Sequence, residues 1–371
     1  MSRPGVRGLL TAGALVCIGT SAGAQLPTSD PEAFAGAEFR TLRFERGSSV
    51  TRLSQIAVPI GAVLPFGRFT LDLGMSWVDS RMVRSDGTRH SVDAFTDSQI
   101  RGSYVFGRDA VVATVLLNLP TGLEEASVRD YVVIGAVSPS LLGFPVATYA
   151  SGFSVTSGLA ASVPAGEWSI GVAGSVRVNS RFTPYTDATG PIIYKPGVEG
   201  RARGAVDGLI GSSRLTVGFT YSTFGDDHFG KTTAVRGLYS PGPRWLAEAV
   251  LVAPIGGSTL SVSLWSFRRT AGDTTGASAR NKENLDAAEV SFAIPLSRAV
   301  VFEPALSGRV SKPQIGKGRL AGAGAGFRIQ LGESVSFTPA ARYDAGWIEG
   351  DPGIRNDVRG GFVSGLFRMS F

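Results

Sequence analysis

The chain has 371 residues, of which 43% are apolar and 18% are charged, and its formal net charge is +6. Ordinary soluble domains carry about 25% charged residues, so this chain is poor in charge. One cysteine and two histidines exclude a disulfide framework and would force any zinc site to rely on carboxylates. Basic residues do not cluster with aromatic ones, which argues against a nucleic-acid partner.

The first 24 residues have the pattern of a secretory signal peptide. Arg3 and Arg7 give a basic start, an apolar stretch follows from 8 to 18, and small residues end at Ala24. We expect the mature chain to begin at Gln25 without the only cysteine. The expected organisation is a signal peptide at 1–24, a short N-terminal segment at 25–35 and one membrane domain at 36–371.

Beyond the signal, segments of about ten residues alternate apolar side chains with small or polar ones. Clear cases are 68–78, 168–178 and 335–344. A tilted β-strand needs about this length to cross a bilayer, whereas a spanning helix needs about 20 apolar residues, and the chain has no such run. The pattern therefore predicts an all-β protein, a transmembrane antiparallel β-barrel.

Short turns alternate with long polar loops along the chain. Four segments with proline second (64–67, 163–166, 253–256 and 294–297) predict tight turns, type I in most, with glycine fourth in three of them. Longer links such as 122–149 are expected to be outer loops, with the short turns on the periplasmic side. The candidate strands are 36–46, 51–64, 68–78, 98–106, 110–119, 153–163, 168–178, 199–209, 214–224, 244–253, 258–267, 284–294, 299–310, 318–331, 334–344 and 358–371. Parity counted back from Phe371 requires the stretch 232–239 to be loop, and we expect about 14–16 strands in all.

The last segment places Val363, Phe367, Met369 and Phe371 on one face and polar side chains on the other. A final strand of this kind resembles the assembly signal of bacterial outer-membrane β-barrels. It predicts the outer membrane of a Gram-negative-type bacterium as the location, with membrane lipid and the barrel-assembly machinery as partners. Five tryptophans are expected near strand ends in an interfacial girdle, although Trp265 falls on the lumen face.

Charged residues on the predicted strands fall on the face opposite the apolar one. An arginine or lysine facing lipid at mid-membrane costs about 2–4 kcal/mol, so these residues should face the lumen. The lumen-lining candidates are Asp72, Arg101, Arg177, Glu199, Arg201, Arg203, Asp207, Glu303, Arg328 and Arg342, together with Glu289, Arg309 and Asp344. They could line a water-filled pore or pair with one another across a filled lumen.

Candidates for catalysis or metal binding are few. His90 and Ser91 would suit a hydrolase, but adjacent residues of an extended segment point to opposite faces. The acidic pair 124–125 and the segment 226–228 could bind a loop calcium, although solvated loop charge is the simpler interpretation. We therefore expect no enzyme activity, no catalytic residue, no metal and no cofactor.

Three stretches carry a family resemblance: 68–77, 111–122 with its Leu-Pro-Thr-Gly ending, and 137–142 with Val-Ser-Pro-Ser-Leu-Leu. They look like the meta-pathway phenol-degradation family of outer-membrane barrels, which is often placed near the FadL-like fatty-acid transporters. The resemblance implies uptake of small, often hydrophobic or aromatic, molecules. The segment from 25 to about 35 is too short for the hatch that plugs fatty-acid transporters.

The leading functional hypothesis is an outer-membrane channel that passes small solutes by passive diffusion. A closed barrel with a structural or surface-binding role is the alternative, and a membrane hydrolase is a third. The sequence leaves open whether the lumen is open or filled.

Overall fold

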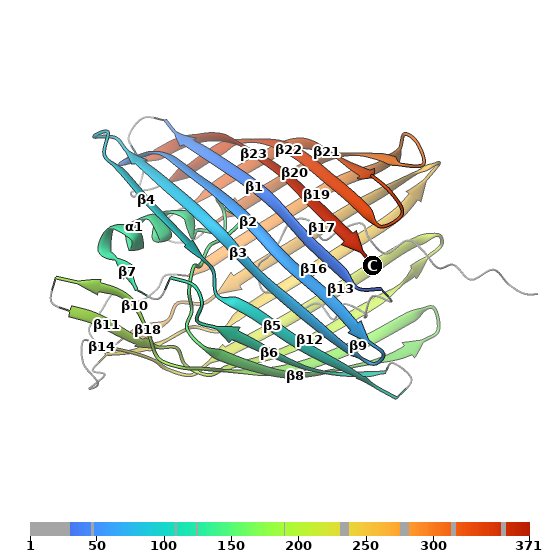
Figure 1. The fold of residues 1–371 in the computed structure, drawn as a ribbon, viewed down its shortest axis with the longest axis horizontal. Helices are drawn as coiled ribbons and strands as arrows, with labels where there is room; N and C mark the ends of the chain where they lie inside the picture. The colour runs from blue at the N-terminus through green and yellow to red at the C-terminus, as the bar shows by residue number, and fades with distance from the viewer. Residues whose placement is uncertain are drawn as a thin grey trace, which may run out of the picture.

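The structure is a computed structural model, and it is a long cylinder of tilted strands (Figure 1). It describes residues 30–45, 48–107, 110–123, 125–188, 190–230, 237–274, 282–312, 317–349 and 354–371. The predicted signal peptide lies outside the described residues. None of the helices in the described part has the length and hydropathy to cross a membrane.

The wall of the cylinder is a closed antiparallel barrel of 16 strands. Each strand pairs with the next along the chain, and the first pairs with the last, from Glu32 opposite Ser370 to Phe44 opposite Val358. The strands are β1 (Glu32–Phe44), β2 (Val50–Phe66), β3 (Phe69–Arg84), β5 (Ser98–Phe106), β6 (Val111–Leu119), β8 (Ser154–Ala165), β9 (Trp168–Asn179), β12 (Glu199–Ile210), β13 (Ser213–Phe224), β16 (Arg244–Ile255), β17 (Ser258–Arg269), β19 (Glu283–Pro295), β20 (Val300–Ser311), β21 (Gly318–Gln330), β22 (Val335–Glu349) and β23 (Arg355–Ser370).

β4 (Arg89–Phe95) extends the wall beyond the membrane and makes the count of strands in this sheet 17. It continues the line of β5 along β3: Trp77 faces Phe95, and Gly74 faces Gln99. The register changes by one residue between these pairs, at Thr96 and Asp97, which is a β-bulge.

A second sheet and one helix form a cap at one end. The sheet contains β7 (Ala126–Ser127), β10 (Phe182–Asp187), β11 (Gly190–Lys195), β14 (Asp227–Gly230), β15 (Gly237–Ser240) and β18 (Asp273–Thr274), and the helix is α1 (Val128–Val137). All come from the long loops and lie at the end away from the C-terminus, on the left of Figure 1. By the usual orientation of such barrels this end is extracellular.

All sixteen predicted strands are present, and the described end of the stretch assigned to an outer loop, residues 237–239, lies in β15 of the cap. Several boundaries differ: the first strand begins at Glu32 instead of residue 36, β3 ends at Arg84 instead of 78, and β22 ends at Glu349 instead of 344. At the start of the first strand, residues 32–35 pair with the end of β23, so ladder hydrogen bonds extend the strand beyond its clear alternation.

The tight turns differ from the type I prediction. Pro65, Pro164 and Pro254 still pair with the neighbouring strand, and the turn begins at the following glycine. Gly67, Gly166 and Gly256 have φ of 64°, 69° and 60°. Since L side chains rarely adopt positive φ, the glycines are required by the first position of a two-residue hairpin turn.

The two faces of the strands divide as the alternation predicts. Val363, Phe367 and Met369 are 54%, 51% and 47% exposed on the outer surface of β23. Their neighbours Ser364 and Val358 are buried on the inward face. The cylinder therefore presents an apolar surface to lipid over its middle.

The apolar core of the molecule lies inside the barrel. Residues 120–123 and 125–153 between β6 and β8, here called the inner loop, begin and end at the outer end of the barrel, and part of the loop folds back inside it. Its side chains Val133, Val137, Leu141, Leu142, Phe144 and Tyr149 pack against the inward side chains Leu42, Leu53, Val78, Met82, Leu285, Leu320 and Val358. The prediction of an outer loop at 122–149 is confirmed, because the loop links the outer ends of β6 and β8. Its packing inside the barrel was not predicted: the strands are apolar on both faces near their outer ends, and the loop covers their inward face.

Candidate functional site in the barrel lumen

The charged residues predicted to face the lumen lie on the inward face of their strands. Arg40 and Gln55 are directly opposite partners that both contact the inner loop, and this identifies the inward face. Directly opposite partners share a face, so the register carries this identification around the barrel. It places Asp72, Arg101, Arg177, Glu199, Arg201, Arg203, Asp207, Glu303, Arg328 and Arg342 inward, with Glu289, Arg309 and Asp344.

Most of these charges are joined in ion pairs between nearby strands. Glu199 on β12 accepts from both Arg201, at 2.8 Å, and Arg244 on β16, at 2.7 Å. Arg203 pairs with Glu248. These residues, with the ones in the next paragraph, form what we call the ion-pair wall, the inward face of β9, β12, β13 and β16.

Two further groups complete the ion-pair wall. Arg214 binds Asp207 with two nitrogens, Nε to Oδ1 at 2.9 Å and Nη2 to Oδ2 at 2.7 Å. Arg177 lies directly opposite Glu199 but makes no ion pair among the described residues, and it donates to the hydroxyls of Ser154, at 3.1 Å, and Ser151, at 3.4 Å. The wall therefore carries more arginine than carboxylate.

Asp72 pairs with Arg101, and Glu303 with Arg328, in the same manner on other strands. In each case the partners lie on adjacent strands, directly opposite or within a few positions. These ion pairs therefore form between neighbouring strands of the wall and do not require side chains to meet across the lumen.

The opposite side of the barrel differs. Here the inward faces of β1, β2, β3, β22 and β23 lie under the inner loop, and we call them the covered wall. Arg40 forms an ion pair through Nη1 with Asp344, at 2.8 Å, and donates from Nε to the carbonyl of Leu142, at 2.7 Å. Asp344 also binds Arg342 at 3.1 Å. The side chains of Arg40 and Asp344 are 1% and 5% exposed, so this cluster is sealed from water.

Arg40 was missed by the sequence analysis, although it shares the inward face with the predicted residues. The sequence did contain a signal: Arg40 lies in the first candidate strand, four residues before Phe44, so alternation places both side chains on the same face. The strand was weakly marked, because small residues occupy much of its lipid face.

The inner loop is held to the covered wall by three further contacts. Gln55 donates to the carbonyl of Val146 and accepts from its amide, both at 2.8 Å. The hydroxyl of Tyr149 donates to Ser80, and burial raises the pKa of Tyr149 to about 12. The tyrosine therefore stays a neutral donor at physiological pH.

A single carboxylate joins the two ends of the inner loop. Asp97, at the β-bulge, accepts from the amide of Gly122 at 3.1 Å and from the amide of Ser151 at 2.7 Å. Asn118 on β6 donates to the same carboxylate at 2.8 Å and to the carbonyl of Gly152 at 2.8 Å. The loop therefore enters and leaves the wall at one hydrogen-bonded point.

Farther along, Gly143 fixes how closely the loop approaches β20. Its φ is 61°, and a Cβ built on it would collide with the guanidinium of Arg309. Ser140 donates to Glu283 of β19 at 3.4 Å. The loop thus spans from β5 and β6, over β1 to β3, as far as β19 and β20.

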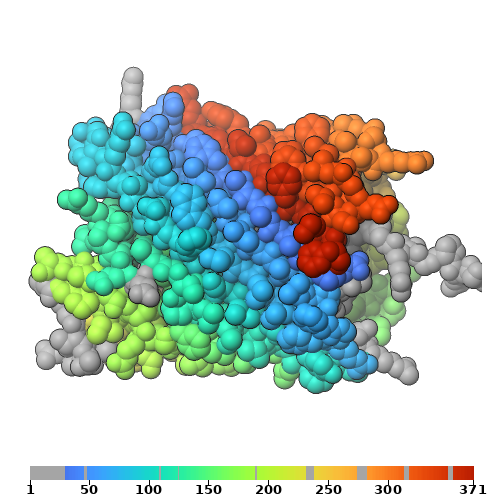
Figure 2. Space-filling view, in the orientation of Figure 1, coloured from blue at the N-terminus to red at the C-terminus, as the bar shows by residue number. Residues whose placement is uncertain are grey.

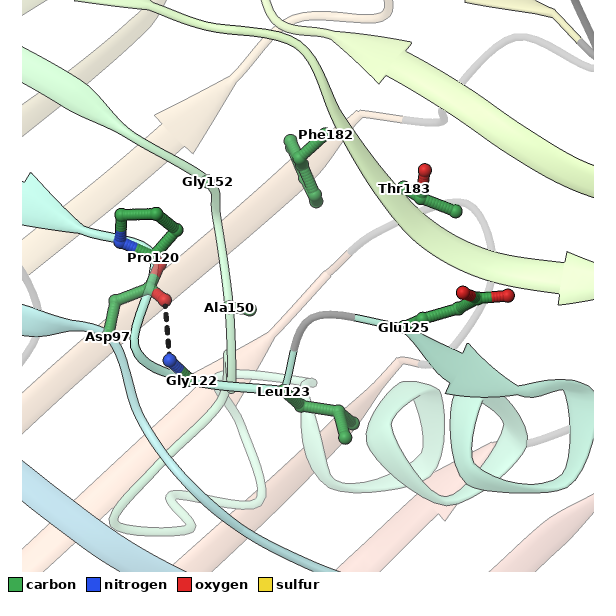
Figure 3. A pocket seen from close by; sticks show the side chains of 9 residues that line it. All are labelled: Asp97, Pro120, Gly122, Leu123, Glu125, Ala150, Gly152, Phe182 and Thr183. Carbon is green, nitrogen blue, oxygen red and sulfur yellow. Dashed lines mark hydrogen bonds between the residues drawn. The ribbon is translucent and has the colours of Figure 1, made fainter.

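One cavity of about 290 Å³ lies beside the point where the loop leaves the wall (Figure 3). Pro120, Leu123 and Phe182 supply its apolar lining, and Asp97 and Glu125 its carboxylates. The carboxylate of Asp97 already holds the loop ends, and Glu125 accepts from Thr186. The cavity therefore has its polar groups engaged by the protein itself.

The residues considered for catalysis are not brought together. His90 faces Met82 across β4 and β3, which puts it on the inward side, whereas Ser91 faces Arg81 on the outward side. Asp227 accepts from Tyr194 and from the amide of Gly197, so it stabilises the cap. No cluster of three or more potential metal ligands occurs in the described parts of the chain.

A closed antiparallel barrel of 16 strands, with an apolar outer belt and a charged lumen, defines the class of outer-membrane β-barrels. No protein-family model matches the chain, and no curated protein matches it. The resemblance to the meta-pathway phenol-degradation family and to FadL-like transporters therefore stays a prediction.

Solved structures do match in fold. The chain is similar to outer-membrane OmpT of Vibrio cholerae, with 9% identity over 93% of this chain and 99% of that chain at a TM-score of 0.43. It is similar to the monoaromatic hydrocarbon channel CymD, with 9% identity over 92% and 88% at 0.47. CdiB from Acinetobacter baumannii gives 12% identity over 93% of this chain and 60% of that chain at 0.52. Identities this low show the fold alone, and the fold places the chain in the Gram-negative outer membrane.

Proposed function

We propose that the chain is an outer-membrane channel that passes small solutes by passive diffusion between the inner loop and the ion-pair wall. The observation that carries the proposal is the contrast in exposure across the lumen. Side chains of Arg201, Arg203 and Arg214 are 23%, 20% and 43% exposed. Arg40, under the loop on the other side, is 1% exposed.

Apolar side chains support the same path. Val250 on β16 lies opposite Thr216 on the inward face and is 39% exposed. Leu209, near the periplasmic end of β12, also faces inward and is 49% exposed. An inward aliphatic side chain keeps this much exposed surface only where the lumen beside it is not filled by protein.

The charges of the ion-pair wall determine the ion selectivity that we expect of the path. Five arginines (Arg177, Arg201, Arg203, Arg214 and Arg244) line it with three carboxylates (Glu199, Asp207 and Glu248). Ion pairs at the water-exposed wall leave fixed charges available to passing solutes, and the excess of arginine favours anions over cations. The transport has no chemical step and needs no catalytic residue.

The solute class rests on the sequence resemblance. It adds small hydrophobic and aromatic molecules to the solutes that should be tested. The apolar surface offered by Val250 and Leu209 is consistent with them, and the charged wall is consistent with aromatic molecules that carry a carboxylate.

The test is ion conductance of the refolded mature chain, residues 25–371, in a planar lipid bilayer. We expect steady steps with a modest anion preference. Folded protein without conductance would reject the channel. It would favour the second candidate, a closed barrel that binds partners through its cap, for which the six-stranded outer sheet is the supporting observation.

A further inference from the structure

Three arginines lie side by side on the outward surface of the barrel. Arg43 on β1 is directly opposite Arg52 on β2 and directly opposite Arg359 on β23. All three are exposed, and they alternate with the buried inward residues Leu42 and Val358. We call Arg52, Arg43 and Arg359 the arginine row. The strands that carry it, β1 and β2 (blue) and β23 (red), run side by side on the near face of Figure 2.

The arginine row destabilises the isolated barrel. Directly opposite residues of an antiparallel pair have Cβ atoms about 4.5–5.5 Å apart, and like charges at that spacing are destabilising. Arg359 is compensated by Glu45. Neither Arg43 nor Arg52 has an ion pair or hydrogen bond among the described residues. Two adjacent guanidinium groups are therefore left to bind something outside the protein.

The surrounding side chains add to the positive charge and mark the water interface. Trp347 on the outward face of β22 lies one rung farther out than the row, since it pairs with Asp357. Arg355 and Arg319 lie over its ring, at 5.0 Å and 5.8 Å from the centroid. Tryptophan is typical of the level of the lipid headgroups.

The height of the row on the cylinder agrees with that level. Arg359 comes 12 positions before Phe371 on β23. At about 3.4 Å per residue and a tilt near 40° this is roughly 30 Å along the membrane normal, just beyond an apolar band about 25 Å tall. Four positions below Arg43 toward the periplasm, Phe39 is 41% exposed in that band. The row therefore meets the headgroups of the outer leaflet.

We propose that the arginine row binds the phosphate groups of an anionic lipid of the outer leaflet. Guanidinium groups bind phosphate in a planar, bidentate manner, and adjacent arginines can share one phosphate between them. A phosphate there would cancel the repulsion within the row, while the acyl chains of the same molecule would lie against Phe39 and its neighbours. The occupant is thus a lipid with a phosphorylated headgroup.

The test uses the protein extracted from outer membranes in a non-ionic detergent and stripped of lipid. Binding of bisphosphorylated lipid A is compared with that of lipid A from which both phosphates have been removed. We expect at least tenfold tighter binding of the phosphorylated form. The variant R43Q/R52Q/R359Q should lose about 100-fold, since each basic residue near the surface contributes roughly a factor of five.

The matched control is R129Q/R181Q/R298Q, which removes three exposed arginines outside the row and should bind like the wild type. If the triple variant does not fold, R43Q alone should lose about fivefold. Equal binding of the two lipids, unchanged binding by the row variants, or an equal loss in the control would overturn the proposal. So would full displacement of lipid A by millimolar inorganic phosphate, because the lipid would then not be the source of the phosphate.

Discussion

The covered wall and the ion-pair wall face each other across one barrel, and they are built from the same antiparallel ladder. On the covered wall the inward positions near the outer end are Leu42, Leu53 and Val78, all at most 2% exposed. On the ion-pair wall the inward positions include Arg201 and Arg203. Strand geometry decides only which residues face inward. Their chemistry decides whether protein or water fills the space in front of them.

The contrast extends to the ion pairs themselves. Exposed pairs contribute about 0–1 kcal/mol each, because water screens them. A sealed pair such as Arg40 with Asp344 is different, since removing one partner leaves an uncompensated buried charge. The two walls can therefore be told apart by substitution.

The largest expected effect comes from Arg40→Ala. It leaves the Asp344 carboxylate buried with only Arg342 and removes the donor to the Leu142 carbonyl. We expect the free energy of unfolding to fall by about 3–5 kcal/mol, measured by urea unfolding in detergent. The control is Arg328→Ala, which breaks the partly exposed pair with Glu303 and should cost no more than about 1 kcal/mol. Equal losses would show that the loop does not seal its wall.

The next effect comes from Gly143→Ala, which should push the inner loop away from β20. A side chain at φ 61° is strained, and the added Cβ meets Arg309. The strained backbone costs about 1–2 kcal/mol in the seating of the loop, and the guanidinium of Arg309 has to move aside. We expect larger conductance steps and faster proteolysis within the loop. Gly135→Ala is the matched control, because a Cβ at Gly135 of α1 has open space around it. Unchanged conductance in the Gly143 variant would place the path away from the loop.

A smaller effect is expected from R201E/R203E on the ion-pair wall. Reversing two inward charges should lower the ratio of anion to cation permeability by about fivefold, since one charge at 4 Å in water is worth about 1 kcal/mol. The readout is the reversal potential in a salt gradient. Arg298→Glu, in a turn outside the membrane, is the control. An unaltered reversal potential would remove Arg201 and Arg203 from the path.

The smallest effect is expected from Tyr149→Phe, which removes the hydrogen bond to Ser80 and should cost about 1 kcal/mol at pH 8. Because burial raises the pKa of Tyr149 to about 12, its neutral form is the one that the fold favours. That contribution is complete below about pH 10, the ordinary tyrosine value, and is lost as the pH rises through 12. Unfolding followed between pH 9 and 12 should therefore show a steeper loss of stability in the wild type than in the variant. Parallel profiles would contradict the buried position of the hydroxyl.

Period-two alternation identified the sixteen strands and the inward face of every predicted lumen charge. Those features are local, because the lipid penalises a charge on the wrong face wherever it occurs. The turns were placed correctly but typed wrongly. Proline can occupy the last paired position of a strand as well as the second position of a turn, and only the backbone shows which.

The packing of the inner loop inside the barrel could not be predicted from its local sequence. Its segment from Tyr131 to Val137 is nearly all apolar, which was a visible signal that it should be buried. Polar residues around that segment were consistent with an outer loop, which it is, but they did not indicate that the loop folds into the barrel. Nothing local to it indicates that the partner surface is the inward face of β1 to β3, more than 40 residues earlier in the chain.

The sequence by itself determined the class of barrel, the positions of the strands and the face on which each predicted lumen charge lies, because alternation along a strand is fixed by its own residues. Only the tertiary structure decided that one wall is covered while the other keeps its ion pairs in water. It also brought Arg52, Arg43 and Arg359, from the first two strands and the last, into one row when the barrel closed. Contacts between residues so far apart depend on closure of the whole sheet, and no local pattern encodes them.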